Sequence, residues 1–168
     1  MHHKRSFRRK LQTFFLSLLL VLLTVAGVPS AAYTAEAASA DTTMAVHFLD
    51  VGQGLSILVQ SQGQNLLYDG GDREHSSFVV SYLQKQNISI IDYMISSHYD
   101  EDHVAGLVGC LDSFSVKNVI GADYVQDTKI YQSFENSVAA QGLTVQHPEP
   151  GTDFSFGSGK FTVLSPQS

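Results

Sequence analysis

The sequence predicts an α/β fold, and two observations support this prediction. Past Asp41, short apolar runs rich in β-branched residues alternate with segments of helical periodicity. The first three of these runs are joined by short connections, a pattern typical of an antiparallel meander. We therefore expect one α/β domain over residues 41–168, with an antiparallel first sheet and helices that cover one face of it.

Three strands are expected at the start of this domain, over residues 44–49, 55–60 and 66–68. A turn through Gln62 and Gly63 joins the second to the third, which ends at Asp69-Gly70-Gly71. Further strands are expected over residues 90–96, 116–120, 143–146, 153–156 and 160–164.

Three helices are expected between these strands, each with an apolar stripe at helical spacing. The first follows Ser76 and Ser77, which we expect to cap its amino terminus. The second begins at His103, and the third ends at Gly142, because glycine readily adopts the left-handed conformation that terminates helices. The stripes are Phe78, Val79, Tyr82 and Leu83; Val104, Leu107, Val108 and Leu111; and Tyr131, Phe134 and Val138.

Residues 1–40 have the order of a secretory signal peptide. Five basic residues lie within residues 4–10, an apolar run follows over 14–28, and the segment ends in Ala38-Ser39-Ala40. We expect cleavage near Ala40 and a mature domain in the cell envelope or medium. A membrane anchor through residues 14–28 is the alternative, although the run is shorter than the ~20 residues that span a bilayer comfortably.

The charge of the chain is uneven and excludes several classes of protein. The net charge is -6, and residues 41–168 contain fifteen acidic and five basic residues. This excess of acid argues against non-specific binding to duplex nucleic acid, which needs several Lys or Arg against phosphates. One cysteine, Cys110, cannot form an internal disulfide. Past Val28 no further long apolar run is present, so the sequence predicts no transmembrane channel in this chain.

Six residues at the end of an expected strand carry the chemistry. They read HYDEDH from His98 to His103, so that two imidazoles and three carboxylates stand together. A divalent cation would relieve the repulsion among the acids, and His with Asp suits Zn, Mn or Fe. The alternative is a solvated turn in which Asp102 caps the next helix and the histidines are incidental. Two His and two Asp within six residues favour the metal site.

These residues also carry a resemblance to a known family. The segment from Ser97 to His103 closely resembles the HxHxDH signature of the metallo-β-lactamase fold. It is more similar still to the HxDxDH variant in the extracellular hydrolase-like domain of ComEC-type competence (DNA-internalisation) proteins. Residues 48–54 (FLDVGQG) and 68–71 (YDGG) resemble two more motifs of that group. The resemblance runs from about Val46 to Pro166 and implies a metallo-β-lactamase-like αββα sandwich, of which this sequence supplies the amino-terminal half.

The resemblance also implies roles for individual residues. His98 and Asp100 match the ligands of one metal ion, and Asp102 and His103 match those of a second. Asp102 matches, in addition, the catalytic carboxylate that orients the nucleophile. Asp69 matches a carboxylate that braces the metal loop. The implied cofactor is one or two divalent ions, zinc first, with Mn or Fe as alternatives.

The sequence departs from the family pattern in three ways. Leu55 stands where the family commonly has an acid, and Asp100 replaces the more familiar histidine. The later ligands, an Asp after TGD and a His in an HHGS-like turn, have no counterpart before Ser168. We interpret His147 as a surface turn residue. We therefore expect a domain that is incomplete at its carboxyl end, with part of a metal site, and inactive as given.

Two glycine-rich turns are further candidates. Asp50, Gly52 and Gly54 could line the site, because glycine lets a backbone approach closely, or could form only a tight turn between strands. Gly70 and Gly71 are candidate lining residues of the same kind.

Three isolated residues are less promising. We expect His47 to be packed or on the opposite face from the site. We expect His75 to be solvated, with a substrate contact as the alternative. We expect Cys110 to be buried and unreactive.

The sequence thus predicts a secreted hydrolase that uses a metal-activated water on phosphodiester or ester bonds. The substrate would be a small-molecule or nucleic-acid phosphodiester, the latter by resemblance only. One alternative is a non-catalytic, metal-stabilised module of a DNA-uptake or envelope assembly. A lactone or β-lactam hydrolase is a further alternative, disfavoured because Asp100 replaces the expected histidine.

Overall fold

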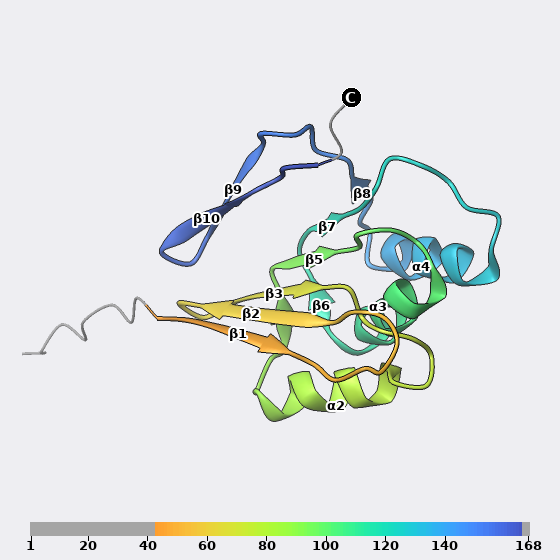
Figure 1. The fold of residues 1–168 in the computed structure, drawn as a ribbon, viewed down its shortest axis with the longest axis horizontal. Helices are drawn as coiled ribbons and strands as arrows, with labels where there is room; N and C mark the ends of the chain where they lie inside the picture. The colour runs from red at the N-terminus through yellow and green to blue at the C-terminus, as the bar shows by residue number, and fades with distance from the viewer. Residues whose placement is uncertain (1–42, 166–168) are drawn as a thin grey trace, which may run out of the picture. The chain divides into compact units, whose positions relative to one another are not determined.

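The computed structural model describes residues 43–165, so the signal peptide predicted for residues 1–40 lies outside the described residues. The main sheet has six strands in the order β1-β2-β3-β5-β7-β8 (Figure 1). These strands are β1 (Met44–Phe48), β2 (Ile57–Ser61), β3 (Gln64–Tyr68), β5 (Tyr93–Ile95), β7 (Val119–Ile120) and β8 (Val145–Gln146). The helices are α2 (Ser76–Lys85), α3 (Glu101–Ser113) and α4 (Lys129–Ala140).

The main sheet is mixed. Strands β1, β2 and β3 form the expected antiparallel meander, whereas β5, β7 and β8 are added in parallel. Parallel pairing follows from the crossovers, because α3 lies between β5 and β7 in the chain and α4 lies between β7 and β8. The α/β class is therefore confirmed, while the expectation of an antiparallel sheet is right only for its first three strands.

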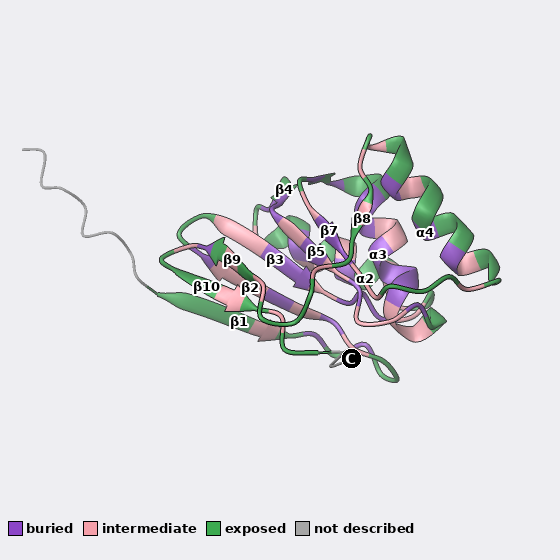
Figure 2. Ribbon diagram, turned by 90° about the horizontal axis from the view of Figure 1, so that it is seen from above, coloured by how far each residue is buried: buried purple, intermediate pink, exposed green. Residues whose placement is uncertain are grey.

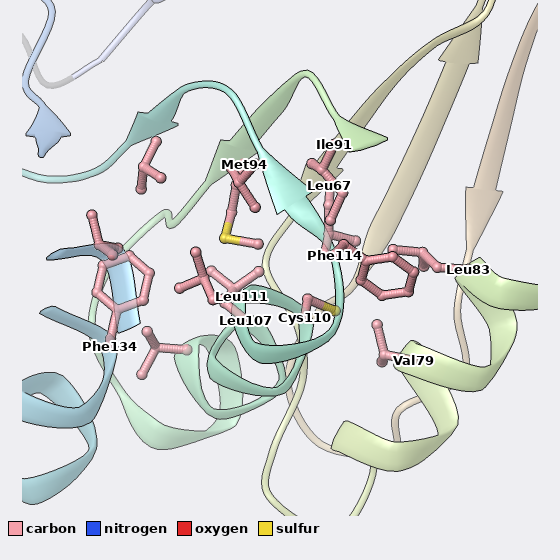
Figure 3. Close-up of a cluster of buried hydrophobic side chains, with 14 of the residues drawn as sticks. Leu67, Val79, Leu83, Ile91, Met94, Leu107, Cys110, Leu111, Phe114 and Phe134 are labelled. Atoms are coloured by element: carbon pink, nitrogen blue, oxygen red, sulfur yellow. The ribbon is translucent and has the colours of Figure 1, made fainter. Parts of the chain in front are cut away.

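The helices cover one face of this sheet and enclose the core (Figures 1 and 3). One row of side chains runs in register across four neighbouring strands, and each of its members is 0% exposed: Leu58, Leu67, Met94 and Val119. The helices pack against this row through fully buried residues, among them Val79 of α2, Leu107 of α3 and Phe134 of α4. Alternation of side chains along each strand places the next row on the opposite face.

The opposite face of the sheet is apolar and only partly covered. Ile57, Tyr68, Ile95 and Ile120 form a second row in register and line a cavity of about 790 Å3. The antiparallel hairpin of β9 (Asp153–Phe156) and β10 (Gly159–Thr162) closes part of the other side. Figure 2 shows exposed residues along β1. Phe48, the last residue of this strand, is 77% exposed.

Two expected strands are each divided in the structure. The strand expected over residues 90–96 is divided into β4 (Ile90–Ile91) and β5. The strand expected over residues 116–120 is divided between β6 (Ser115–Val116) and β7, and β4 pairs with β6 in a separate sheet. The break falls at Asp92, whose carboxylate accepts from the Asn65 amide (2.9 Å) and Lys117 Nζ (2.7 Å). These partners satisfy the buried carboxylate at the point where the first of the two strands is interrupted.

The helix ends also differ from expectation in part. Helix α2 is not capped by Ser76 or Ser77; its first residue follows His75, whose amide donates to Asp72 Oδ1 over 2.9 Å. Helix α4 ends just before Gly142, which has φ +72°, as expected for a glycine stop. None of the helices within residues 43–165 is long and apolar enough to cross a bilayer.

Candidate metal centre

The candidate ligands lie where β5 runs into helix α3. Strand β5 ends at Ile95, and α3 begins at Glu101, two residues earlier than the sequence pattern indicated. The parallel neighbour β3 ends at the same edge, where the amide of Asp69 donates to the Ile95 carbonyl over 2.8 Å. Carboxyl ends of neighbouring parallel strands meet at one edge of a sheet, so the Asp-Gly-Gly turn and the HYDEDH segment are adjacent.

Asp69 is the buried centre of this region. Its side chain is 0% exposed, and its two oxygens accept three hydrogen bonds. The donors are the Ser97 amide (2.8 Å), the Ser97 hydroxyl (2.6 Å) and His103 Nδ1 (2.8 Å). A buried carboxylate is stable only with such partners, so these bonds fix the loop that precedes α3.

The hydrogen bonds also determine which ring nitrogen of each histidine is free. His103 must donate from Nδ1, because ionised Asp69 can only accept. The Ser97 hydroxyl donates to Asp69, so its oxygen accepts from His98 Nδ1 over 2.9 Å. In both imidazoles Nδ1 is therefore engaged, and Nε2 is the nitrogen left to face a metal, as in metal-binding histidines whose other nitrogen is held by a carboxylate or hydroxyl.

Each free Nε2 lies beside a carboxylate. His98 Nε2 is 3.5 Å from Asp100 Oδ2, and His103 Nε2 is 3.8 Å from Asp102 Oδ2. The two rings are neighbours, with centroids 4.0 Å apart. Two ligands of one tetrahedral zinc ion lie about 3.3 Å apart, since each bond is about 2.0 Å long. The donor types and spacings therefore fit a divalent metal as two separate ligand pairs.

The fit is incomplete within the part of the chain that the structure describes. Over residues 43–165, no group of three or more His, Cys, Asp and Glu side chains is arranged to hold one ion. The pairs also differ in exposure: the side chain of Asp100 is 61% exposed and that of His103 is 18% exposed. The structure therefore supplies partial ligand sets that are open to solvent.

The acids of this segment have separate partners. Asp100 is the residue at the amino-terminal cap of α3 and Asp102 lies inside the first turn, so the alternative in which Asp102 caps the helix is wrong. Glu101 pairs with Arg73, with 3.4 Å between Arg73 Nε and Glu101 Oε1. Arg73 is thus the base that contacts this acidic turn.

The glycine turns contact the segment at two points. A side chain at Gly54 would place Cβ 2.0 Å from the Asp102 carbonyl oxygen, and Gly54 has φ +105°. The Gly70 amide donates to the His103 carbonyl over 2.8 Å. Both glycines therefore permit the close approach of backbone to α3.

The remaining candidates of these turns have other neighbours. Gly52 lies against the His75 ring, Gly71 lies against Val51, and Asp50 accepts from the Gly52 amide over 3.3 Å. Their contacts are those of a tight turn.

The other single residues lie away from the ligand pairs. His47 Nδ1 contacts the Tyr82 hydroxyl of α2 over 2.9 Å, so His47 packs on the helix-covered face of the sheet, which is one of the two expected placements. His75 is half-buried, not solvated, and its hydrogen bond holds the pKa of Asp72 below its ordinary value. Cys110 is buried, which raises the pKa of its thiol to about 12. His147 is exposed and lies 3.1 Å from the Gly121 carbonyl oxygen.

Sequence reasoning missed three residues that contact the HYDEDH segment or hold it in place. Ser97 was part of the motif without a role, yet it links Asp69 to His98. Gln126 Nε2 donates to Asp100 Oδ1 over 3.1 Å, and the Tyr124 hydroxyl accepts from the Tyr99 amide over 3.1 Å. Ser97 could have been found from its place in the motif. Gln126 and Tyr124 carry no local signal, because they come from a distant loop.

Comparison with known families identifies the superfamily of this chain, and the matched residues include the candidate ligands. The sequence model of the metallo-beta-lactamase superfamily matches residues 49–160, so the chain belongs to this superfamily. The chain is also 28% identical over 131 residues to Recombination protein 2 of Haemophilus influenzae, covering 75% of this chain. It is 36% identical over 63 residues to Competence protein ComA of Neisseria gonorrhoeae, covering 37% of this chain. The chain spans 15% and 9% of the length of these two proteins.

Solved structures show the same fold. The chemotaxis sensor ODP, in a structure described as a peroxy diiron species, matches with a TM-score of 0.53 at 18% identity, over 74% of this chain and 50% of the sensor. The Rm3 metallo-beta-lactamase matches with a TM-score of 0.51 at 18% identity, over 70% of this chain and 47% of the enzyme. At this identity the likeness concerns the fold alone.

Proposed function

We propose that this chain contributes to the active site of a metal-dependent hydrolase that acts on phosphodiester or ester bonds. The observation that carries the proposal is the pair of Nε2 atoms, on His98 and His103, that each lie beside an Asp carboxylate while Nδ1 of the same ring is hydrogen-bonded. Membership of the metallo-beta-lactamase superfamily supports a hydrolase in general terms. The donor set of two His and two Asp suits zinc first, with Mn or Fe as alternatives.

The roles of the residues follow from their hydrogen bonds. His98 with Asp100 would hold one ion, and His103 with Asp102 would hold the same ion or a second one. Asp69 keeps both imidazoles in the Nδ1-protonated form, directly at His103 and through Ser97 at His98. Asp102, 29% exposed, is the carboxylate available to orient a nucleophile. When bound, a divalent ion supplies a nucleophile at neutral pH by lowering the pKa of water.

Two observations bear on the substrate. The names of two relatives, Recombination protein 2 and Competence protein ComA, favour a nucleic-acid phosphodiester over a small-molecule one. The fifteen acids against five bases of residues 41–168 oppose a long polyanion. We therefore favour a short phosphodiester that enters the exposed edge of the sheet, where a divalent ion would offset part of the negative charge.

A non-catalytic module is the second candidate. The observation that favours it is the acidic charge of residues 41–168, which opposes turnover of a polyanionic substrate. In this case a metal would stabilise a part of a DNA-uptake or envelope assembly without turnover. Metal content together with hydrolysis separates the two candidates, because the module binds metal and has no activity.

The test uses the full-length protein and the model substrate bis-p-nitrophenyl phosphate. We expect one or two transition-metal ions per chain, loss of metal in His98→Ala, Asp100→Ala and His103→Ala, and loss of hydrolysis in Asp102→Asn. His147→Ala, an exposed histidine outside the ligand pairs, is the matched control and should keep both properties. Full metal content in all three ligand variants would refute the site, and metal without hydrolysis in the wild type would favour the module.

We also propose export to the cell envelope or medium, since residues 1–40 have the order of a signal peptide. Amino-terminal sequencing of the mature protein should find a start near Asp41. A membrane-bound product that retains residues 14–28 would instead support the anchor.

A further inference from the structure

The loop between β7 and α4, residues 121–128, lies against the HYDEDH segment. Three hydrogen bonds join the two stretches, which are more than twenty positions apart in the chain. The superfamily motif names only the ligands, so nothing in it requires this loop. Its contacts fall on the two residues that follow His98.

Tyr99 attaches this loop to the segment. It is 1% exposed, its hydroxyl donates to the Ala122 carbonyl over 2.8 Å, and its amide donates to the Tyr124 hydroxyl over 3.1 Å. Its ring packs against the rings of Tyr124 and Tyr131, with centroids 5.1 and 4.6 Å away. A side chain at Gly121 would place Cβ 2.5 Å from the Tyr99 hydroxyl, so the fit is tight. The buried ring therefore fixes the start of the loop relative to the candidate ligands.

Gln126 extends this contact to a candidate ligand. Its Nε2 donates to Asp100 Oδ1 over 3.1 Å, while the other oxygen, Oδ2, lies 3.5 Å from His98 Nε2. The two carboxylate oxygens thus have separate partners, one from the loop and one from the ligand pair. The Asp100 side chain is 61% exposed and would otherwise sample several rotamers, so a donor on one oxygen restricts the direction of the other.

We propose that Gln126 is a positioning residue that orients Asp100 toward the metal, in a loop whose place is set by Tyr99. This inference rests on the proposed function, because it takes Asp100 as a ligand. An amide suits the role: it donates to the carboxylate without adding a charge that would compete with the ion. The simpler alternative is a surface hydrogen bond without effect on the metal. Outer partners of metal ligands typically change metal affinity by about 10–100-fold when removed, which makes the two alternatives distinguishable.

The experiment measures zinc affinity by chelator competition in the full-length protein. We expect the zinc dissociation constant to rise about 10–100-fold in Gln126→Ala. The same rise is expected in Gln126→Asn, whose side chain is one methylene too short. Gln132→Ala, an exposed glutamine on the first turns of α4, is the matched control and should bind as the wild type does. Tyr124→Phe, which removes the acceptor of the Tyr99 amide, should give a smaller rise.

A second readout separates positioning from a general loss of stability. The visible absorption spectrum of the cobalt(II) form reports the ligand geometry, and we expect it to change in Gln126→Ala at saturating cobalt but not in Gln132→Ala. Unchanged affinity and spectrum in Gln126→Ala, beside a wild type that binds metal, would overturn this inference and leave the proposed function intact. A wild type that binds no divalent metal would overturn both.

Discussion

Gly70 and Gly106 are in direct backbone contact. A Cβ atom on Gly106 would lie 1.8 Å from the Gly70 carbonyl oxygen, and one on Gly70 would lie 2.3 Å from the Leu107 amide nitrogen. The Gly106 amide also donates to the Gly71 carbonyl over 3.1 Å. The Asp-Gly-Gly turn and helix α3 are therefore in close backbone contact, and this contact brings Asp69 within reach of His103.

We expect Gly106→Ala to destabilise the fold by about 3 kcal/mol or more, because the new methyl group cannot be accommodated without moving α3 away from the Asp-Gly-Gly turn. Urea denaturation measures this change. Gly159→Ala is the control, since the nearest atom to its Cβ would be 3.9 Å away. Equal stability of the two variants would show that the contact is looser than the structure indicates.

Replacing Asp69 should affect both stability and metal binding. In Asp69→Asn we expect the free energy of unfolding to fall by about 1–3 kcal/mol, because Ser97 and His103 lose a charged acceptor in a buried place. We expect metal affinity to fall about 10–100-fold, because neither Nε2 is then held as the free nitrogen. Calorimetry and chelator competition measure the two effects. Asp153→Asn, an exposed carboxylate with its own hydrogen bonds, should change neither property appreciably.

Burial of the Cys110 thiol should lower the free energy of unfolding at alkaline pH. Burial raises the pKa of its thiol from 9.0 to about 12 in the folded state. Below pH 9 the thiol is protonated in both states and has no effect; as pH rises from 9 to about 12, only the unfolded thiol ionises. The free energy of unfolding should therefore fall by about 1.4 kcal/mol per pH unit in this window from this group alone. Cys110→Ala should show a correspondingly flatter pH dependence in denaturant titrations, and an identical slope would contradict the assignment.

The apolar face of the main sheet predicts the behaviour of residues 41–168 expressed alone. Met44 and Val46 are 54% and 48% exposed, and they line the cavity together with β2 and β3 residues. Several hundred Å2 of wet apolar surface costs on the order of 10 kcal/mol at ~25 cal/mol per Å2, comparable to the stability of a whole domain. We therefore expect this fragment to be inactive, to bind metal weakly, and to bind the dye ANS or aggregate.

A matched pair of variants localises that effect. Val46→Thr together with Phe48→Thr should lower the ANS fluorescence of the fragment, whereas Phe78→Thr, on the exposed side of α2, should not. A soluble monomer that unfolds cooperatively, excludes ANS and binds zinc tightly would contradict the prediction.

The local pattern of the sequence predicted the elements and failed at their ends. The buried faces of the helices could be recognised because apolar residues, among them Leu107 and Phe134, recur at helical spacing. In the folded protein these residues lie on the side of each helix that packs against the sheet. The division of residues 90–96 into two strands could not be recognised from the sequence. It involves Lys117, which reaches Asp92 from the connection between β6 and β7. The start of α2 is a second example. Asp72 accepts a hydrogen bond from the His75 amide just before this helix, whereas the sequence pattern had indicated capping by Ser76 or Ser77.

The sequence by itself determined the superfamily, the candidate ligands and the neighbouring turn, because the HYDEDH and YDGG segments are contiguous and their residue types define the donors. The tertiary structure alone decided how those donors are held. Asp69 meets Ser97 and His103 only because β3 and β5 are parallel neighbours. Gln126 meets Asp100 only because the buried ring of Tyr99 fixes a distant loop. Orientation of a side chain depends on partners far away in the chain, and those partners are adjacent only after the sheet has formed.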